Sequence, residues 1–268
     1  MGIVNVTPDS FSDGGLYLDP RAAISHGEEL AAQGADILDV GGESTRPGAA
    51  EVAVDEELRR VAPVIAGLAG SGVEISVDTS KAAVAAAALD AGATIVNDVT
   101  ALRGDPEMAA LVADRGAGIV LMHMAGDPRT MQVNPEYQDV VAEVRDFLAA
   151  RLAAAVAAGI EESRIWLDPG IGFGKTDQHN FELLRGLDQL AALGRPIVIG
   201  TSRKSFIGRA DGSATDDRLG GTIATSILAA AAGASVLRVH DVREMSEALK
   251  LSSAILGSGP ASPTRALG

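Results

Sequence analysis

The chain has 268 residues, of which 47% are hydrophobic, an ordinary proportion for a globular protein with one sizeable core. Its net charge of −14, from 22 basic against 36 acidic residues, disfavours nucleic acid and anionic membranes as partners. Cysteine is absent, which excludes disulfides, thiol catalysis and thiolate metal sites.

Neither a targeting segment nor a membrane-spanning segment is evident in the sequence. The N-terminus lacks the charged region and the cleavage site of a secretory signal, and the most apolar stretch, residues 223–237, is too short to span a bilayer. Together with the absence of cysteine, this predicts a cytoplasmic protein without a membrane partner. The stretch GSGPASPTRALG at 257–268 is rich in turn-forming residues, and we expect it to be a disordered tail.

One pattern repeats along the chain: a short β-branched run, a polar loop, and an amphipathic helix rich in Ala, Leu and Glu. The runs lie at 2–6, 35–41, 74–79, 94–99, 118–124, 165–170, 196–202 and 235–241. Eight such units in about 255 residues predict a single-domain α/β fold, a (β/α)8 TIM barrel over residues 1–256. The alternative is an open doubly wound sheet, but no G-x-G-x-x-G turn follows the first run. In a barrel the active site lies where strands end and βα loops begin.

The first two predicted strands lead into unusual loops. The first ends at Asn5 and continues as NVTPDSFSDGG, in which residues 7–15 are expected to form a lid, with Phe11 covering a bound ligand. The second leads into GGESTRPGA, where Thr45 and Arg46 are hydrogen-bond donors and Pro47 shapes a turn. This second loop is also compatible with an ordinary turn into the next helix.

Strands three, four and six end in the acidic or amide side chains of Asp78, Asn97 and Asp168. A polar group at the end of an apolar strand is costly unless it is paired or used. We expect the Asp168 carboxylate to face the barrel interior, with capping of the next turn as the alternative. The stretch LDPGIGFGKT that follows lacks the four-residue spacing between glycines of a P-loop, so it is expected to be a Gly-rich loop that presents Phe173.

Strands seven and eight end in basic side chains. In GTSRKSF (200–206) we expect Lys204 to reach inward and Arg203 to point elsewhere, although a solvated turn fits equally well. The eighth strand reads V-L-R-V-H-D, and its two-residue alternation places Arg238 and His240 on one face. If that face is the interior, the two suit a phosphate or pyrophosphate. A salt bridge from Arg238 to an Asp on a neighbouring strand is the alternative.

Together these side chains predict a ligand with two chemically different ends. The acidic and amide group of strands three, four and six is expected to lie opposite the basic group of strands seven and eight. A 2-amino-4-oxo-pyrimidine edge, as in pterin or guanine, presents donors that a carboxylate accepts in pairs. A phosphate would occupy the basic side.

These motifs, in this order, closely resemble the dihydropteroate synthase family of folate biosynthesis. The matching stretches are NVTPDSFSDGG, DVGGESTRPGA, SVDTSK, IVNDVTALR, VLMHM, LDPGIGFGK, GTSRKSF and LRVHDV, and they cover residues 1 to about 256. The resemblance implies condensation of 6-hydroxymethyl-7,8-dihydropterin diphosphate with p-aminobenzoate, with release of pyrophosphate, by an enzyme that is commonly a homodimer. Because loop two lacks the inserted Phe-Gly of sulfonamide-insensitive relatives, we expect sulfonamides to compete with p-aminobenzoate.

The resemblance also implies a role for each matched residue. It assigns the pterin to Asp78, Asn97, Met122, Asp168 and Lys204. It assigns the diphosphate to Asn5, Thr45, Arg46, Arg238 and His240, with Mg²⁺ bridging Asn5 and diphosphate oxygens. It assigns p-aminobenzoate to Thr45, Pro47, Phe173, Ser202, Arg203 and Lys204. The residues expected to act in catalysis are Asp9, Asp78, Lys204, Arg238 and His240, with Asp9 approaching the metal.

The implied reaction is a dissociative substitution, because the pterin ring can delocalise positive charge if its bond to the diphosphate breaks first. Mg²⁺ and the cationic side chains would stabilise the leaving pyrophosphate without a protein nucleophile. Two other functions stay open. A pterin-binding methyltransferase would share the barrel, although methyl transfer needs no pyrophosphate site. A catalytically idle homologue would only bind pterin.

Overall fold

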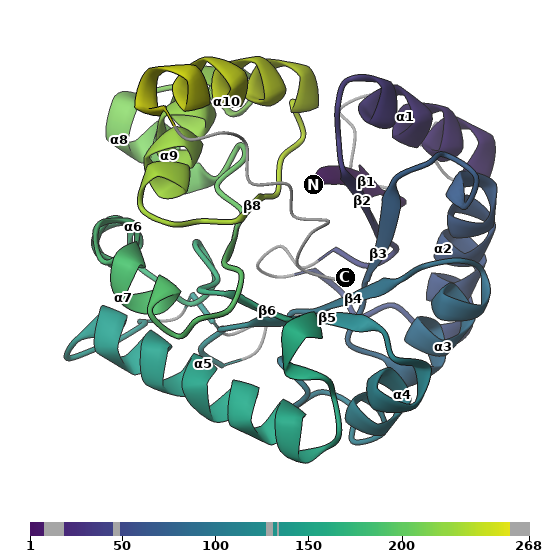
Figure 1. Cartoon of the computed structure of the whole chain (residues 1–268). Coiled ribbons are helices and arrows are strands. Elements are labelled where there is room, and N and C mark those ends of the chain that lie inside the picture. The colour runs from purple at the N-terminus through teal and green to yellow at the C-terminus, as the bar shows by residue number, and fades with distance from the viewer. Residues whose placement is uncertain (8–18, 45–48, 127–130, 133, 258–268) are drawn as a thin grey trace.

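The computed structural model describes residues 1–7, 19–44, 49–126, 131–132 and 134–257. Within these residues strands and helices alternate along the chain, with the strands forming an inner ring and the helices an outer one (Figure 1). The predicted residues Asp9, Phe11, Thr45, Arg46 and Pro47 lie outside the described residues, as does the predicted tail from residue 258 onward.

Eight parallel strands form the inner ring. They are β1 (Gly2–Asn5), β2 (Ile37–Gly41), β3 (Glu74–Asp78), β4 (Ile95–Asp98), β5 (Gly118–Met122), β6 (Ile165–Asp168), β7 (Val198–Ile199) and β8 (Val236–Leu237). Strands β1 to β6 pair in sequence order, and β7 pairs with β8. Single bridges join Leu167 to Ile197 and Gly2 to Val239, so β6 meets β7 and β8 meets β1. These contacts close the ring and confirm the predicted barrel.

Strands seven and eight are shorter than predicted, because β7 and β8 contain two residues each rather than the seven of the predicted runs. Only a single bridge joins the β7 segment to β6, and only a single bridge joins the β8 segment to β1, so the regular ladder does not continue there. The backbone bonds that close the barrel persist there: Ile3 N donates to Val239 O at 3.0 Å, and Val239 N donates to Met1 O at 3.0 Å.

The outer ring contains two more helices than the one-per-strand pattern predicts, counted over the described residues. The helices are α1 (Pro20–Ala32), α2 (Val54–Leu68), α3 (Ala82–Asp90), α4 (Met108–Arg115), α5 (Val140–Ala157), α6 (Asp177–Arg185), α7 (Leu187–Ala191), α8 (Ser205–Asp211), α9 (Leu219–Ala231) and α10 (Val242–Leu256). Short 3-10 turns lie at Glu162–Arg164 and Thr215–Asp217. The extra helices are α7 after β6 and α8 after β7.

The starts of the helices follow from the local sequence. Asp19 accepts a hydrogen bond from Arg21 N at the start of α1, with Pro20 in the first turn, where its missing N–H costs nothing. Asp139 accepts from Val141 N and Ala142 N at the start of α5. These caps satisfy backbone donors that have no partner within the helix.

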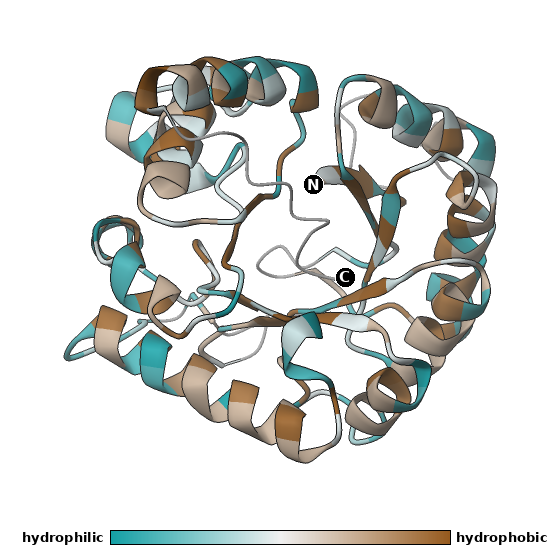
Figure 2. Cartoon of the chain, viewed as in Figure 1, coloured by the Kyte–Doolittle hydropathy of each residue, from teal (hydrophilic) through white to brown (hydrophobic). Residues whose placement is uncertain are grey.

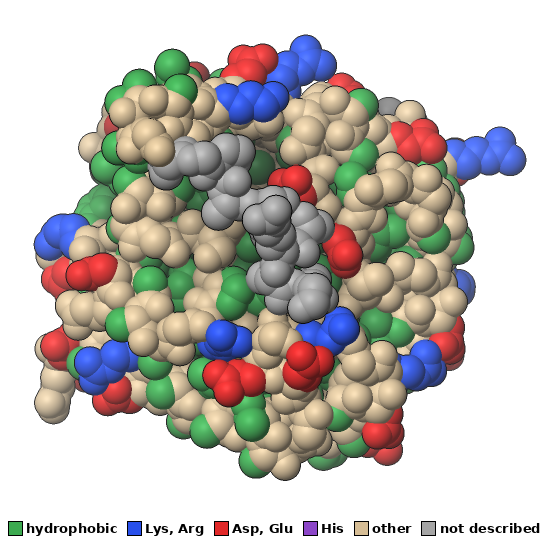
Figure 3. All heavy atoms as spheres, in the orientation of Figure 1, with side chains coloured by type: hydrophobic (Ala, Val, Ile, Leu, Met, Phe, Trp, Pro, Cys, Tyr) green, Lys and Arg blue, Asp and Glu red, His purple; other side chains and the backbone are tan. Residues whose placement is uncertain are grey.

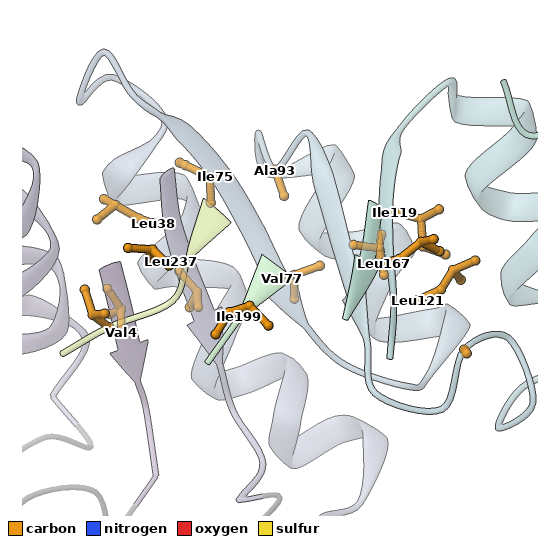
Figure 4. Close-up of a cluster of buried hydrophobic side chains, with 14 of the residues drawn as sticks. Val4, Leu38, Ile75, Val77, Ala93, Ile119, Leu121, Leu167, Ile199 and Leu237 are labelled. Atoms are coloured by element: carbon orange, nitrogen blue, oxygen red, sulfur yellow. The ribbon is translucent and has the colours of Figure 1, made fainter. Parts of the chain in front are cut away.

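The strands bury both faces, which explains their near-continuous apolar runs. One face packs against the helices, and its cluster includes Val4, Leu38, Val77, Leu167 and Leu237 (Figure 4). The other face fills the barrel interior with Ile37, Ile95, Val120, Trp166, Val198 and Val236. The two-residue alternation of a strand therefore decides which residues point into the barrel.

The molecular surface is mixed in charge. The strands are mainly hydrophobic in colour and the helices carry both colours, as expected for helices with one buried side (Figure 2). On the face seen in Figure 3, acidic and basic side chains are interspersed around the periphery.

Among the described residues, no helix combines the length and the apolar character that crossing a membrane requires.

Candidate active site

The predicted strand-end residues occupy inward positions at the carboxyl end of the barrel. One residue near the end of each of six strands packs outward against the helices: Val4, Val77, Val96, Leu121, Leu167 and Leu237. The next residue along each of these strands therefore faces the interior. These inward residues are Asn5, Asp78, Asn97, Met122, Asp168 and Arg238. The structure thus brings together side chains from six strands at the face where barrel enzymes carry their active sites.

Arg238 and Asp78 form an ion pair across the mouth of the barrel. Arg238 Nη2 donates to Asp78 Oδ2 at 2.8 Å, and Arg238 Nε donates to Asp39 Oδ2 at 2.6 Å. The acidic and basic groups are therefore interlocked, and the prediction that they lie opposite each other is wrong for Arg238. The reason is that β8 lies beside β1, which brings its arginine within reach of β2 and β3. The alternative of a salt bridge to a neighbouring Asp describes this side chain.

Asp39 was not predicted as a site residue. It lies on β2, is fully buried, and its Oδ2 also accepts from Asn97 Nδ2 at 3.0 Å. A signal was present in the sequence, because Asp39 shares the inward alternation of Ile37 within an otherwise apolar strand. A charge at such a position is rarely tolerated unless it is paired.

Burial raises the pKa values of the Asp78 and Asp168 carboxyls. Burial raises the pKa of Asp78, an effect that the Arg238 charge opposes and that the Asp39 charge reinforces. Burial also raises the pKa of Asp168, opposed chiefly by the Lys204 charge. The pKa of Arg238 is raised as well, since its two carboxylate partners outweigh the loss of hydration. Arg238 therefore stays charged and opposes protonation of Asp78, whose pKa burial raises to about 7.

Asp168 combines both of the roles considered for it. Its carboxylate is buried at an inward position, and Oδ1 also accepts from Gly170 N at 2.7 Å, which caps the turn that follows. Gly170 has φ +67, and a Cβ at this position would lie 1.9 Å from His123 O. Only glycine fits there, so the backbone of the loop after β6 lies directly against the loop after β5.

Lys204 reaches inward, as predicted, and lies beside Phe173. Its Nζ is 4.5 Å from the centroid of the Phe173 ring and also donates to the carbonyl of Ile171. Burial lowers the pKa of Lys204 to about 8, although the Asp168 charge opposes the shift. A cation over the face of an aromatic ring is attracted by the ring electrons, so this contact holds the Lys204 and Phe173 side chains together.

The remaining residues of strands seven and eight lie nearer the rim. His240 Nδ1 and Ser202 Oγ are 2.9 Å apart, and His240 N donates to the same hydroxyl at 3.2 Å. Arg203 points away from the interior, as predicted, and pairs with Asp241 at the start of α10, leaving its side chain 47% exposed. In this conformation Arg203 does not frame the pocket with Lys204, unlike the role that the resemblance implies.

A second basic group, Lys175, was also not predicted. Its Nζ is buried, lies 2.9 Å from His123 Nδ1 and donates to Phe173 O at 2.9 Å. Burial lowers the pKa of Lys175 to about 7 and that of His123 to about 3. A lysine within a Gly-rich loop resembles a surface residue in sequence, so no sequence signal identified it. Its bonds fix the backbone of loop six next to the Phe173 ring.

The base of loop two is held by a buried ion cluster. Lys81 Nζ donates to Glu43 and, at 2.6 Å, to Glu57 Oε2 on α2, and Glu57 is fully buried. Glu43 Oε1 accepts from Val52 N at 3.1 Å, which joins the two sides of the loop. These contacts tie the second βα loop to the third strand's loop.

Comparison with known proteins identifies the family. The model of the pterin-binding enzyme family matches residues 1–240. Dihydropteroate synthase of Mycobacterium leprae (strain TN) is 51% identical over 268 residues, covering 97% of this chain and 94% of the relative.

Solved structures give the same result. Yersinia pestis dihydropteroate synthase, with a sulfonamide drug, has a TM-score of 0.92 and 44% identity over 96% of this chain and 94% of that one. Xanthomonas albilineans dihydropteroate synthase in complex with 7,8-dihydropteroate has a TM-score of 0.86 and 48% identity over 96% of this chain and 92% of that one. This chain therefore belongs to the dihydropteroate synthases of the pterin-binding enzyme family.

Proposed function

We propose that the chain condenses 6-hydroxymethyl-7,8-dihydropterin diphosphate with p-aminobenzoate to give 7,8-dihydropteroate and pyrophosphate. The observation that carries this proposal is the inward group of Asp78, Asn97 and Asp168 beside Arg238 and Lys204. Acceptors and cations meet in one pocket, and the reaction needs both. The related structure that holds 7,8-dihydropteroate carries the same product on the same fold.

The pterin end of the substrate matches the acceptors. The edge of a 2-amino-4-oxo-pyrimidine presents N–H donors side by side, and a carboxylate accepts two such bonds in parallel. Asp78 and Asp168 supply carboxylates from opposite parts of the ring, and Asn97 supplies an amide between them. Met122, buried beside Phe173 in a small apolar cluster, offers a surface for the ring.

The bond changes are those of a dissociative substitution. The bond between the pterin methylene carbon and the diphosphate oxygen breaks, and its electron pair leaves with pyrophosphate. The amine nitrogen of p-aminobenzoate then forms the new bond to this carbon and loses a proton to pyrophosphate or solvent. Arg238, Lys204 and His240 stabilise the developing negative charge, and the Asp78 carboxylate stabilises the positive charge on the pterin ring.

A magnesium ion fits this pocket as a partner of the diphosphate. Mg²⁺ binds few protein oxygens and fills the rest of its octahedron with phosphate oxygens and water. Asn5 Oδ1 faces the same space as Asp78 Oδ2, since a Cβ built on Gly41 would lie 3.7 Å from the first and 3.8 Å from the second. When bound, the ion would neutralise charge on the leaving pyrophosphate.

The p-aminobenzoate is proposed to bind beside Phe173 and Lys204, with Ser202 at the rim. Sulfonamides resemble this substrate in shape, and the Yersinia pestis relative has been solved with a sulfonamide drug. We expect sulfamethoxazole to raise the apparent KM for p-aminobenzoate without lowering the maximal rate. An inhibitor effect that p-aminobenzoate does not relieve would contradict this placement.

A homodimer and a cytoplasmic location complete the proposal. Leu228 on α9 and Leu251 and Ile255 on α10 are 69%, 64% and 75% exposed, and these adjacent helices offer an apolar surface for a second copy. The absence of cysteine suits a reducing compartment. Light scattering that gives a monomer mass at assay concentration would contradict the dimer.

The experiment that tests the function directly is product formation. The protein is mixed with 6-hydroxymethyl-7,8-dihydropterin diphosphate, p-aminobenzoate and Mg²⁺, and 7,8-dihydropteroate is measured by mass spectrometry. We expect product only when all components are present. Pterin binding without product would instead support the catalytically idle homologue.

A further inference from the structure

Asp39 is an unusual residue for the place it occupies. It lies one inward position below the mouth on β2, and the strand register aligns it with Ser76 on β3 and Ile95 on β4. The barrel interior is otherwise filled mainly by apolar side chains, which include Ile95, Trp166 and Val236. Its side chain is fully buried. A buried carboxylate costs free energy unless it is paired and hydrogen-bonded, so its presence needs an explanation from its partners.

Both partners of Asp39 are side chains of the proposed pocket. A single oxygen, Oδ2, accepts from Arg238 Nε at 2.6 Å and from Asn97 Nδ2 at 3.0 Å. These two residues approach from β4 and from the end of β8, so Asp39 joins side chains from different parts of the ring. Asp39 is the only charged residue of β2.

The bond to Asn97 determines which end of that amide meets a ligand. An amide side chain has a donor end and an acceptor end, and Asp39 can accept only from the donor end. The carbonyl end, Oδ1, is therefore directed away from Asp39. A pterin edge presents donors, so this orientation gives Asn97 the polarity that the substrate requires.

The bond to Arg238 keeps the guanidinium in place when substrate binds. Arg238 Nη2 bonds to Asp78, and a ligand that donates to Asp78 competes for the same carboxylate. The Nε bond to Asp39 lies deeper in the barrel, because Asp39 is two residues before Gly41, the register partner of Asp78, so we do not expect a ligand bound to Asp78 to compete for it. Arg238 can thus release Asp78 and turn its Nη groups to the substrate without leaving the barrel.

We propose that Asp39 is a positioning residue, which sets the polarity of Asn97 and anchors Arg238 for substrate binding. The inference rests on the proposed function, since the substrate that profits from this orientation is the dihydropterin diphosphate. Asp39 itself does not contact the reacting atoms. Its loss should therefore weaken recognition of one substrate and spare the other.

The first test compares Asp39→Asn with Ser76→Ala. Ser76 pairs with Asp39 in the strand register and is equally buried, but its hydroxyl has no hydrogen-bond partner among the described residues. Because the charge that holds Arg238 is lost, we expect Asp39→Asn to raise KM for dihydropterin diphosphate at least about tenfold and to leave KM for p-aminobenzoate within about twofold. Ser76→Ala should change neither. A folded Asp39→Asn protein with an unchanged pterin KM, or with both KM values raised equally, would overturn the proposal.

The second test exchanges the two polar groups. Asn97→Asp alone places a second carboxylate against Asp39, and we expect it to lose pterin binding. In the double variant Asp39→Asn/Asn97→Asp, the amide introduced at position 39 can donate to the carboxylate introduced at position 97. The buried charge is conserved, so this variant also serves if Asp39→Asn alone fails to fold. We expect a pterin KM lower than that of either single variant, and an effect equal to the product of the single effects would contradict the proposal.

These outcomes separate the inference from the proposed function. A wild-type protein that forms no 7,8-dihydropteroate contradicts the function. Normal wild-type turnover with an unaltered pterin KM in folded Asp39→Asn contradicts only the role of Asp39.

Discussion

Arg238 and Asp78 are 160 residues apart in the chain, yet Arg238 Nη2 lies 2.8 Å from Asp78 Oδ2. Closure of the barrel makes this contact possible, because β8 meets β1 and only β2 separates β1 from β3. Burial raises the pKa of Asp78 to about 7, and the Arg238 charge opposes this rise at the carboxylate that we propose as the acceptor for the pterin edge. If the pterin binds Asp78 as proposed, it exchanges this bond for new ones, so we expect recognition of the pterin and placement of the arginine to be coupled.

The Asp78 carboxylate should dominate pterin affinity. Asp78→Asn removes the charge but keeps the shape, and loss of a charged hydrogen bond costs about 1.5–3 kcal/mol, or about 10- to 150-fold in Kd. Calorimetry with 6-hydroxymethyl-7,8-dihydropterin measures this change. Asp90→Asn, at an exposed carboxylate paired with Arg115, is the matched control and should bind normally. Equal affinities for wild type and Asp78→Asn would remove Asp78 from the pterin site.

The turn after Asp168 should tolerate no side chain at Gly170. Gly170→Ala combines a strained φ of +67 with a Cβ 1.9 Å from His123 O, and we expect a loss of at least about 2 kcal/mol in the free energy of unfolding. Gly194→Ala has a similar φ of +75 but nothing within 4 Å, so it should cost only about 1 kcal/mol. Urea unfolding compares the two. Equal losses would show that the close approach to loop five does not matter.

Lys175 should make stability depend on pH in the alkaline range. Its pKa is lowered to about 7 in the folded protein, so between that value and its ordinary pKa the unfolded chain binds the extra proton. Stability then rises with pH, by at most about 1.4 kcal/mol per pH unit for this group.

Lys175→Met removes this titration. The free energy of unfolding of wild type, relative to that of Lys175→Met, should therefore increase as pH rises from about 7.5 to 9.5. Urea unfolding across this range gives the comparison. Parallel pH profiles for the two proteins would mean that Lys175 stays charged when buried.

Phe173 should matter for p-aminobenzoate more than for the pterin. Its ring lies against the Lys204 ammonium, a contact worth about 0.5–2 kcal/mol, so Phe173→Leu should raise KM for p-aminobenzoate about 2- to 30-fold. Phe181→Leu, in an aromatic pair with Phe206, controls for general loss of ring packing. Steady-state kinetics with each substrate varied in turn gives both constants. A rise confined to the pterin KM would mean that Phe173 contacts the pterin instead of p-aminobenzoate.

The fold and much of the site could be predicted because strand periodicity carries the information. Alternation in V-L-R-V-H-D places Arg238 inward, and Asp78, Asn97 and Asp168 follow the same rule on their strands. The eight repeats indicated the barrel, which the comparisons confirm. The matched motifs indicated the family, because several long specific stretches occur in order.

The parts that were missed depend on contacts between strands distant in sequence. Nothing local in ILDVG shows that Asp39 meets both Arg238 and Asn97, since those contacts exist only once the ring is closed. Nothing in GFGKT shows that Lys175 turns inward to His123. The acidic and basic groups were predicted apart for the same reason, because strand order alone does not give the reach of an arginine side chain.

The most direct test of the proposed activity is the release of pyrophosphate from dihydropterin diphosphate in the presence of Mg²⁺, measured with and without p-aminobenzoate. We predict release only when p-aminobenzoate is present, with one pyrophosphate formed for each 7,8-dihydropteroate over repeated turnover. No release, or steady release that is independent of p-aminobenzoate, would contradict the assignment.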